Sequence, residues 1–251
     1  MRVLAEPDDV AEAAAHEFMA IVSGAISQRD VAHVALTGGS TVPRLYWHLI
    51  GVADHEALDW AHVELWWGDE RIVVAGDLAA HAHSARETLL GPASPARAAR
   101  VHAFPLGVAL RDGAARAAAD YAAELEQRIP TDADGLPVFD LVLLGMGADG
   151  HILSVFPGSA ALAPGAPLVS AVPAPTHVEP HLPRLTLNPR VIGAARHVVV
   201  MCTGAAKAAR VAEVLAGPDD VERLPAQLAR GDNAVWLLDA AAAAAWRPQT
   251  G

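Results

Sequence analysis

Apolar positions along the chain follow two alternating patterns, a helical spacing near 3.6 residues and short unbroken runs. After Pro7 and the acidic pair Asp8-Asp9, helical spacing predicts a first helix. The residues that share its apolar face are Val10, Ala14, Phe18, Ile21, Val22 and Ala25. Apolar, β-branched runs predict strands at 31–36, 62–67, 101–104, 139–144, 197–202 and 234–238. Further helices are expected at 42–50, 84–90, 111–129, 205–215 and 224–230.

This alternation predicts an α/β fold, a Rossmann-like and mostly parallel sheet flanked by helices. The runs 139–144 and 197–202 are apolar almost throughout, as in strands buried on both faces. A proline-rich stretch at 157–183 is expected to form a long irregular excursion, and loops of that length are usually functional. We predict a single domain over residues 1–251, with ligands bound beyond the carboxyl ends of the strands.

Composition and charge narrow the class of protein. Apolar residues make up 53% of the chain, which permits a sizeable core, and the net charge of −11 disfavours a nucleic-acid partner. The single cysteine, Cys202, excludes an internal disulfide framework and fits a core thiol. No apolar stretch is long enough to cross a membrane, and the acidic start is unlike a signal peptide. We expect a cytoplasmic protein without a membrane partner, whose oligomeric state stays open, a monomer included.

The segment Thr37-Gly38-Gly39-Ser40-Thr41 joins a predicted strand to a predicted helix. Gly38 and Gly39 let the backbone approach a ligand closely, and the helix that follows offers free N–H groups to an anion. Ser40 or Thr41 can add a hydroxyl or cap the helix. The lysine of a nucleotide-binding P-loop is missing, so nucleotide triphosphate binding does not follow. An anion cradle and a plain tight turn with a Ser/Thr cap remain equal alternatives.

Three charged residues, Asp69, Glu70 and Arg71, follow the predicted strand that ends in Trp66-Trp67. Active sites of α/β proteins form at such strand ends. The alternative is a solvated turn with a surface ion pair, and the two interpretations have comparable weight.

The segment 145–151 (GMGADGH) follows the most apolar predicted strand and formally matches the GxGxxG dinucleotide motif. A dinucleotide site also needs a helix next and an acid about 20 residues on, but prolines follow here and Ser170 stands near the acid position. The segment is therefore interpreted as a glycine-rich turn that presents Asp149 and His151. Histidine is the usual general base near neutral pH, and a neighbouring carboxylate can orient it. We favour this role over a histidine that only hydrogen-bonds a loop carbonyl.

Two further cations stand near predicted junctions, Arg184 in the segment PRLT and Lys207 shortly after the strand that ends at Cys202. Either could join free N–H groups in holding a phosphate. Taken alone, each is more often a surface charge.

Metal binding and a serine nucleophile have little support in the sequence. The alternating His177, Glu179 and His181 could ligate a metal in an extended strand, and His81 and His83 offer a similarly weak pair. Prolines surround the first group, and no helical HExxH spacing is present. No G-x-S-x-G elbow occurs either. We expect no bound metal.

Six segments, taken in order, resemble the glucosamine-6-phosphate isomerase/6-phosphogluconolactonase superfamily. They are LTGGST (36–41), WWGDER (66–71), DLVLLGMGADGH (140–151), SVFPGS (154–159), PRLTLNP (183–189) and TGAAKA (203–208). The ordered set spans most of the chain and is far more specific than any one member. The resemblance implies the deaminase/lactonase fold of that superfamily.

Two positions are similar to the lactonase branch of the superfamily. Arg71 completes an Asp-Glu-Arg triplet where deaminases carry Asp-Glu-Tyr, and Phe156 stands where deaminases carry a glutamate of the ring-opening machinery. The resemblance implies hydrolysis of 6-phospho-glucono-1,5-lactone, a phosphorylated sugar lactone, to 6-phosphogluconate in the oxidative pentose phosphate pathway. It also implies that neither a metal nor an organic cofactor is needed.

The resemblance further implies a role for each candidate residue. A water deprotonated by His151 would attack the lactone, with Asp149 orienting the base. Arg71, next to Asp69 in the same catalytic segment, would stabilise the oxyanion or bind phosphate. The loop 38–41, Arg184 and Lys207 would hold the 6-phosphate.

Some positions depart from the family pattern. Ile152, Leu153 and Val155 replace the Thr, Ala and Leu common after the DGH triplet, and Ala80-His81 replaces a Ser-Asn pair, so His81 is a candidate for its supporting role. Two other functions remain as alternatives. The first is a deaminase or isomerase acting on a hexosamine phosphate, against which Phe156 counts. The second is a non-catalytic sugar-phosphate-sensing module, which would need a DNA-binding segment that no basic N-terminal extension supplies.

Overall fold

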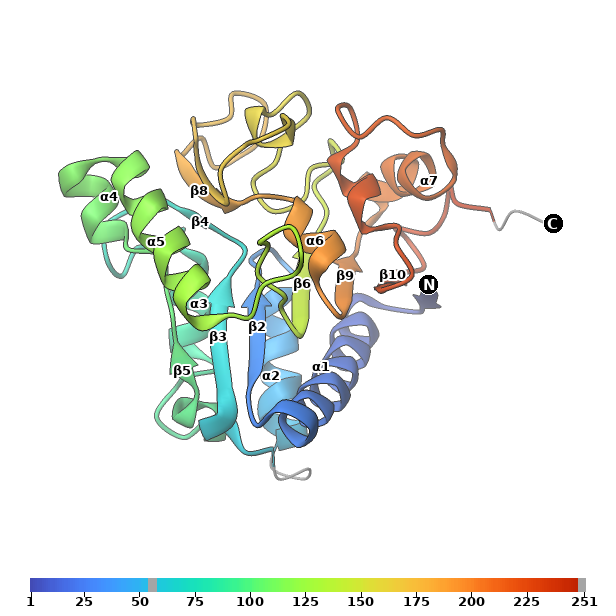
Figure 1. Ribbon diagram of the computed structural model, residues 1–251. Helices are drawn as coiled ribbons and strands as arrows, with labels where there is room; N and C mark the ends of the chain where they lie inside the picture. The colour runs from blue at the N-terminus through green and yellow to red at the C-terminus, as the bar shows by residue number, and fades with distance from the viewer. Residues whose placement is uncertain (54–57, 248–251) are drawn as a thin grey trace.

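A seven-stranded parallel sheet forms the centre of the computed structural model, which describes residues 1–53 and 58–247. The strand order is β1-β10-β9-β6-β2-β3-β5, and all neighbours run parallel. The strands are β1 (Arg2–Leu4), β2 (Ala32–Leu36), β3 (Val63–Trp67), β5 (Arg100–Val101), β6 (Leu141–Gly145), β9 (Val198–Cys202) and β10 (Ala234–Asp239). Helices flank this sheet in Figure 1, so the predicted Rossmann-like fold is confirmed.

Seven α-helices accompany the strands within the described residues. They are α1 (Pro7–Arg29), α2 (Val42–Ala53), α3 (His81–Glu87), α4 (Leu106–Asp112), α5 (Ala114–Arg128), α6 (Arg190–Ala194) and α7 (Ala208–Ala216). The first begins at Pro7, as predicted, with Asp8 and Asp9 in the first turn, where negative charge suits the helix dipole. It packs against α2 and lies along β2, β9 and β10.

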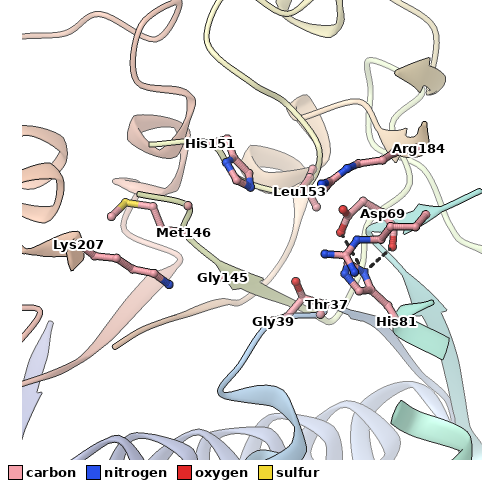
Figure 2. Close-up of a pocket in the computed structure, with 13 residues that line it drawn as sticks. Thr37, Gly39, Asp69, His81, Gly145, Met146, His151, Leu153, Arg184 and Lys207 are labelled. Carbon is pink, nitrogen blue, oxygen red and sulfur yellow. Dashed lines mark hydrogen bonds and ion pairs between the residues drawn. The ribbon is translucent and has the colours of Figure 1, made fainter. Parts of the chain in front are cut away.

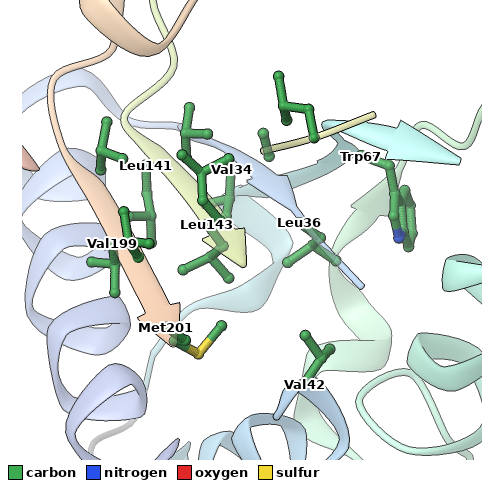
Figure 3. Close-up of a cluster of buried hydrophobic side chains, with 14 of the residues drawn as sticks. Val34, Leu36, Val42, Trp67, Leu141, Leu143, Val199 and Met201 are labelled. Carbon is green, nitrogen blue, oxygen red and sulfur yellow. The ribbon is translucent and has the colours of Figure 1, made fainter. Parts of the chain in front are cut away.

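The core explains why the strand sequences show no polar alternation. Every residue of β2, β3 and β9 is buried, because helices or loops cover both faces of the sheet. Figure 3 shows Val34, Leu143 and Val199, from three adjacent strands, in one apolar cluster. This packing fixes the strand ends from which the functional loops emerge.

Several predicted elements differ in detail from the observed ones. The helix expected at 111–129 is two helices, α4 and α5, because Gly113 takes a φ of 100°, a conformation that glycine accepts readily. The helix expected at 205–215 starts with a 3₁₀ turn (Ala205–Lys207) before α7, and the one at 224–230 is a 3₁₀ helix (Pro225–Ala229) throughout. The strand expected at 101–104 is the short β5.

A second, antiparallel sheet was not predicted. It consists of β4 (Asp69–Arg71), β8 (Arg184–Leu187) and β7 (Val169–Val172), in the order β4-β8-β7. The solvated-turn alternative for 69–71 is therefore wrong, since Asp69 and Glu70 are only 2% and 1% exposed. The expectation of an irregular excursion at 157–183 is also wrong where β7 runs. These strands are too short to show a period of two.

Among the described residues, no helix is both long and apolar enough to cross a bilayer. Residues 54–57 and 248–251 lie outside the described part, so one domain over residues 1–251 stays a prediction.

Candidate active site

The carboxyl ends of β2, β6 and β9 lie side by side, and a pocket of about 190 Å³ opens beyond them (Figure 2). Parallel strands place the loops that follow them at one edge of the sheet, which is why segments distant in sequence meet here. Seven of the predicted site residues line the pocket: Gly38, Gly39, Asp69, Arg71, His151, Arg184 and Lys207. The other three, Ser40, Thr41 and Asp149, are not among the lining residues.

His151 and Asp149 form a close pair on the turn after β6. His151 Nδ1 lies 2.5 Å from Asp149 Oδ1, and the backbone N–H of His151 donates to the same oxygen at 3.2 Å. The turn is compact because the N–H groups of Gly147 and Gly150 donate to the carbonyls of His151 and Gly147, and Gly150 takes a φ of 90°. The pair is thus held by backbone geometry rather than by chance contact.

The charge state of Asp149 follows from its surroundings. Burial alone would raise the pKa of this carboxyl, but hydrogen bonds from His151 and His177 and the charge of His151 outweigh burial and hold the pKa well below its usual range. Asp149 is therefore a carboxylate at neutral pH, and it can orient the His151 ring so that Nε2 is left for chemistry.

Asp69 and Glu70 hold together segments that lie around the pocket. Asp69 Oδ2 accepts a 2.5 Å hydrogen bond from Ser154 Oγ, and the Asp69 carbonyl lies 3.2 Å from His81 Nδ1. The Glu70 carboxylate accepts hydrogen bonds from the backbone N–H groups of Arg71, His81 and Ala82, so it anchors the first turn of α3. Sequence reasoning gave no role to Ser154, although it lies only three residues beyond His151.

His81, for which the resemblance suggested a supporting role, lines the pocket. Its ring lies directly against the backbone of Gly38, where an added Cβ would come within 2.1 Å of Nε2. Gly38 is therefore required for this close approach. The prediction that His81 takes over a supporting role stays a prediction.

Arg71 and Arg184 lie opposite one another in the β4–β8 register. Arg184 is only 2% exposed, so the interpretation of this residue as a surface charge is wrong. Burial, and next the charge of Arg71, lower the pKa of Arg184. The carboxylates of Asp69 and Asp149 act on Arg184 in the opposite direction. Two neighbouring guanidinium groups at the pocket can still bind an anion through their free N–H groups.

Lys207 lies on the other side of the pocket from Arg184 in Figure 2. Thr41 Oγ1 lies 3.0 Å from Thr203 Oγ1, which ties the loop after β2 to the segment that leads to Lys207. Ser40 is exposed on the same loop. Phosphate contacts from Ser40 and Thr41 stay predictions.

The histidines considered as metal ligands do not come together. His177 Nε2 lies 3.0 Å from Asp149 Oδ2, whereas His181 Nδ1 lies 2.6 Å from the carbonyl of Pro175 and its Nε2 lies 2.9 Å from Glu179. Across residues 1–53 and 58–247, no cluster of three or more His, Cys, Asp or Glu side chains suits a metal ion. The absence of a metal remains an expectation to be tested.

Comparison with known proteins gives a consistent family. Residues 5–237 match the family model described as glucosamine-6-phosphate isomerases/6-phosphogluconolactonase. The 6-phosphogluconolactonase of Streptomyces coelicolor is 37% identical over 243 residues, 93% of this chain and 89% of the relative. The 6-phosphogluconolactonase of Mycobacterium tuberculosis is 34% identical over 250 residues, 97% of each chain.

Solved structures agree with the sequence comparisons. The 6-phosphogluconolactonase of Trypanosoma brucei superposes with a TM-score of 0.84 at 30% identity and covers 97% of each chain. A monomeric glucosamine-6-phosphate deaminase, at 19% identity and a TM-score of 0.79, shares the fold. The chain belongs to the glucosamine-6-phosphate isomerase/6-phosphogluconolactonase family.

Proposed function

We propose that this chain hydrolyses 6-phosphoglucono-1,5-lactone to 6-phosphogluconate, a step of the oxidative pentose phosphate pathway. One observation carries the proposal: the His151–Asp149 pair adjoins a pocket that Arg71, Arg184 and Lys207 also line. A base and several cations are thereby within reach of one small phosphorylated substrate. Relatives named 6-phosphogluconolactonase that align over nearly the whole chain support the same substrate.

His151 is the proposed general base. Asp149 engages Nδ1, so Nε2 accepts a proton from water and the hydroxide attacks C1 of the lactone. The tetrahedral intermediate collapses with cleavage of the bond between C1 and the ring oxygen, and the imidazolium returns the proton to that oxygen. A lactone is an activated ester, so no enzyme nucleophile is required. Cys202 is not one, because burial raises the pKa of its thiol to about 11.

The cations supply two kinds of stabilisation. Arg71 Nε and Arg184 Nε are buried and have no hydrogen-bond partner within the described part of the chain. Buried donors of this kind favour a bound acceptor such as a phosphate or an oxyanion. We assign Arg184 and Lys207 to the 6-phosphate, and Arg71 to the oxyanion or the phosphate.

Phe156 disfavours the deaminase alternative. Its ring centroid lies 4.6 Å from that of His151, so an aromatic side chain fills the place where deaminase chemistry would need a proton-exchanging acid. A non-catalytic sensor would need no general base, so the close pairing of His151 with Asp149 counts against this alternative.

A coupled assay tests the proposal directly. Lactone generated in situ by glucose-6-phosphate dehydrogenase is followed through the enzymatic oxidation of 6-phosphogluconate, with and without the purified chain. We expect product formation well above the spontaneous rate of hydrolysis. A rate equal to the spontaneous one, with tight binding of 6-phosphogluconate, would support the sensor; release of ammonia from glucosamine-6-phosphate would support the deaminase.

Gly147→Ala is expected to lower kcat roughly tenfold, because strain of about 1.4 kcal/mol corresponds to that factor. A Cβ at this position would come within 2.1 Å of His151 Nδ1 and 2.6 Å of Asp149 Oδ1, so the pair must move apart. Steady-state kinetics measure the effect. Gly193→Ala is the control, because a Cβ at that position would meet nothing within 4 Å. Unchanged kcat in Gly147→Ala would argue against a role for the close pair.

Full activity is expected to survive exhaustive EDTA treatment and dialysis, since the proposed reaction uses His151 and cationic side chains alone. The measurement is the coupled assay before and after chelation. Activity lost with EDTA and restored by zinc would instead revive the ligand set His177, Glu179 and His181.

A further inference from the structure

His177 contacts the catalytic pair from outside the pocket. It is not among the pocket-lining residues, yet its Nε2 lies 3.0 Å from Asp149 Oδ2, the oxygen that His151 leaves free. Asp149 thus lies between two imidazoles, with Oδ1 toward His151 and Oδ2 toward His177. The second imidazole has no part in the chemistry proposed above.

The surroundings of His177 hold it in this position. Its ring meets the edge of Phe156 at 5.7 Å between centroids, and Phe156 in turn packs against His151. The guanidinium of Arg184 lies 5.3 Å from the centroid of the same Phe156 ring. The Phe156 ring therefore packs near both histidines and near Arg184, a predicted phosphate ligand.

We propose that His177 is a positioning residue that fixes the Asp149 carboxylate, and through it the orientation and basicity of His151. This role rests on the proposed function. His177 Nε2–H donates to Asp149 Oδ2, and Asp149 Oδ1 accepts from His151 Nδ1–H. His151 Nε2 then faces the water.

The direction of the effect on His151 follows from electrostatics. A donor on Oδ2 withdraws negative charge from the carboxylate and so weakens its stabilisation of the His151 imidazolium. Without His177, the carboxylate would rotate more freely and would stabilise the imidazolium more strongly. His151 would then be protonated, and inactive as a base, up to a higher pH.

Two cations from neighbouring elements act close to the pair. Arg184 acts on Asp149 from the side of β8, and Arg210 of α7 donates to the carbonyl of Ala148 next to it. Within the described residues, neither arginine forms a hydrogen bond with His177. The His177 side chain is 52% exposed, so its effect is expected to be moderate.

The test compares three variants in the coupled assay across a range of pH. His177→Ala should lower kcat by about 3- to 10-fold, the loss of roughly one hydrogen bond, with KM little changed because His177 does not line the pocket. The acid limb of the pH–rate profile should move up by roughly 0.3–0.7 pH unit. His177→Gln, which keeps an N–H donor, should restore kcat to within about twofold.

His181→Ala is the matched control. It removes an imidazole from the same proline-rich segment, where His181 contacts Pro175 and Glu179. If the substitutions act only by loosening the segment, His181→Ala should lower kcat as much as His177→Ala does. That result would overturn the proposal. The proposal would also be overturned if His177→Ala had the kcat of the unaltered protein and an unmoved acid limb in its pH–rate profile.

A second readout does not depend on lactonase activity. In protein labelled with ¹⁵N-histidine, the imidazole signals of His151 report which nitrogen carries the proton and the pH at which the ring titrates. We expect the Nδ1–H form in the unaltered protein, and in His177→Ala a titration displaced to higher pH. If the chain proves inactive on the lactone, the proposed function fails while this measurement still decides the role of His177; an unchanged titration would reject it.

Discussion

His151→Asn is expected to lower kcat for the lactone by about 10²–10⁴, the usual contribution of a positioned general base. Asparagine is smaller than histidine but keeps a polar side chain at this position, and it cannot accept a proton from water at neutral pH. His151 sits on a turn fixed by its own backbone hydrogen bonds, so the substitution should leave the fold intact. The loss should therefore appear in kcat, with KM changed much less.

The measurement is initial-rate kinetics at neutral pH, with the spontaneous hydrolysis of the lactone subtracted. Thermal unfolding of the variant verifies that it is folded, and His48→Asn, on the partly exposed side of α2, provides a histidine control outside the pocket. A folded His151→Asn with near-wild-type turnover would show that another group activates the water.

Lys207→Ala and Arg184→Ala should each weaken the use of the phosphorylated lactone by roughly 10- to 150-fold in kcat/KM, mainly through KM. The basis is the loss of one charge-assisted contact, about 1.5–3 kcal/mol. Hydrolysis of unphosphorylated gluconolactone, which is slow to begin with, should barely change, since it lacks the group that these cations hold.

The two substrates separate phosphate binding from chemistry. Equal losses on both would show that the residue supports folding or the reaction itself, which is a particular concern for the buried Arg184. Arg190→Ala removes an exposed arginine paired with Asp134 and should leave both substrates unaffected. Because Lys207 and Arg184 lie on different sides of the pocket, a selective loss in only one variant would place the phosphate on that side.

The sequence by itself determined the order of the main strands and helices along the chain and the turns at their ends. Apolar, β-branched runs predicted β2, β6 and β9, and in β6 and β9 the sequence shows no polar alternation because these strands are buried on both faces. Local composition also revealed the glycine turn that carries Asp149 and His151, since glycines and a polar pair after a buried strand have few structural explanations. The expectation that a neighbouring carboxylate orients His151 agrees with the 2.5 Å between His151 Nδ1 and Asp149 Oδ1.

Only the tertiary structure decided how the cations and the second histidine join the site. Arg71 faces Arg184 because two short strands, far apart in sequence, pair in a sheet that neither strand's pattern predicts. His177 reaches Asp149 from a segment whose prolines indicated only an irregular loop. Local sequence determines the periodicity of helices and strands and the residues of their turns. The Arg71–Arg184 and His177–Asp149 contacts depend instead on long-range strand pairing and on packing around Phe156. The free energy of these interactions is gained only after distant segments of the chain have come together.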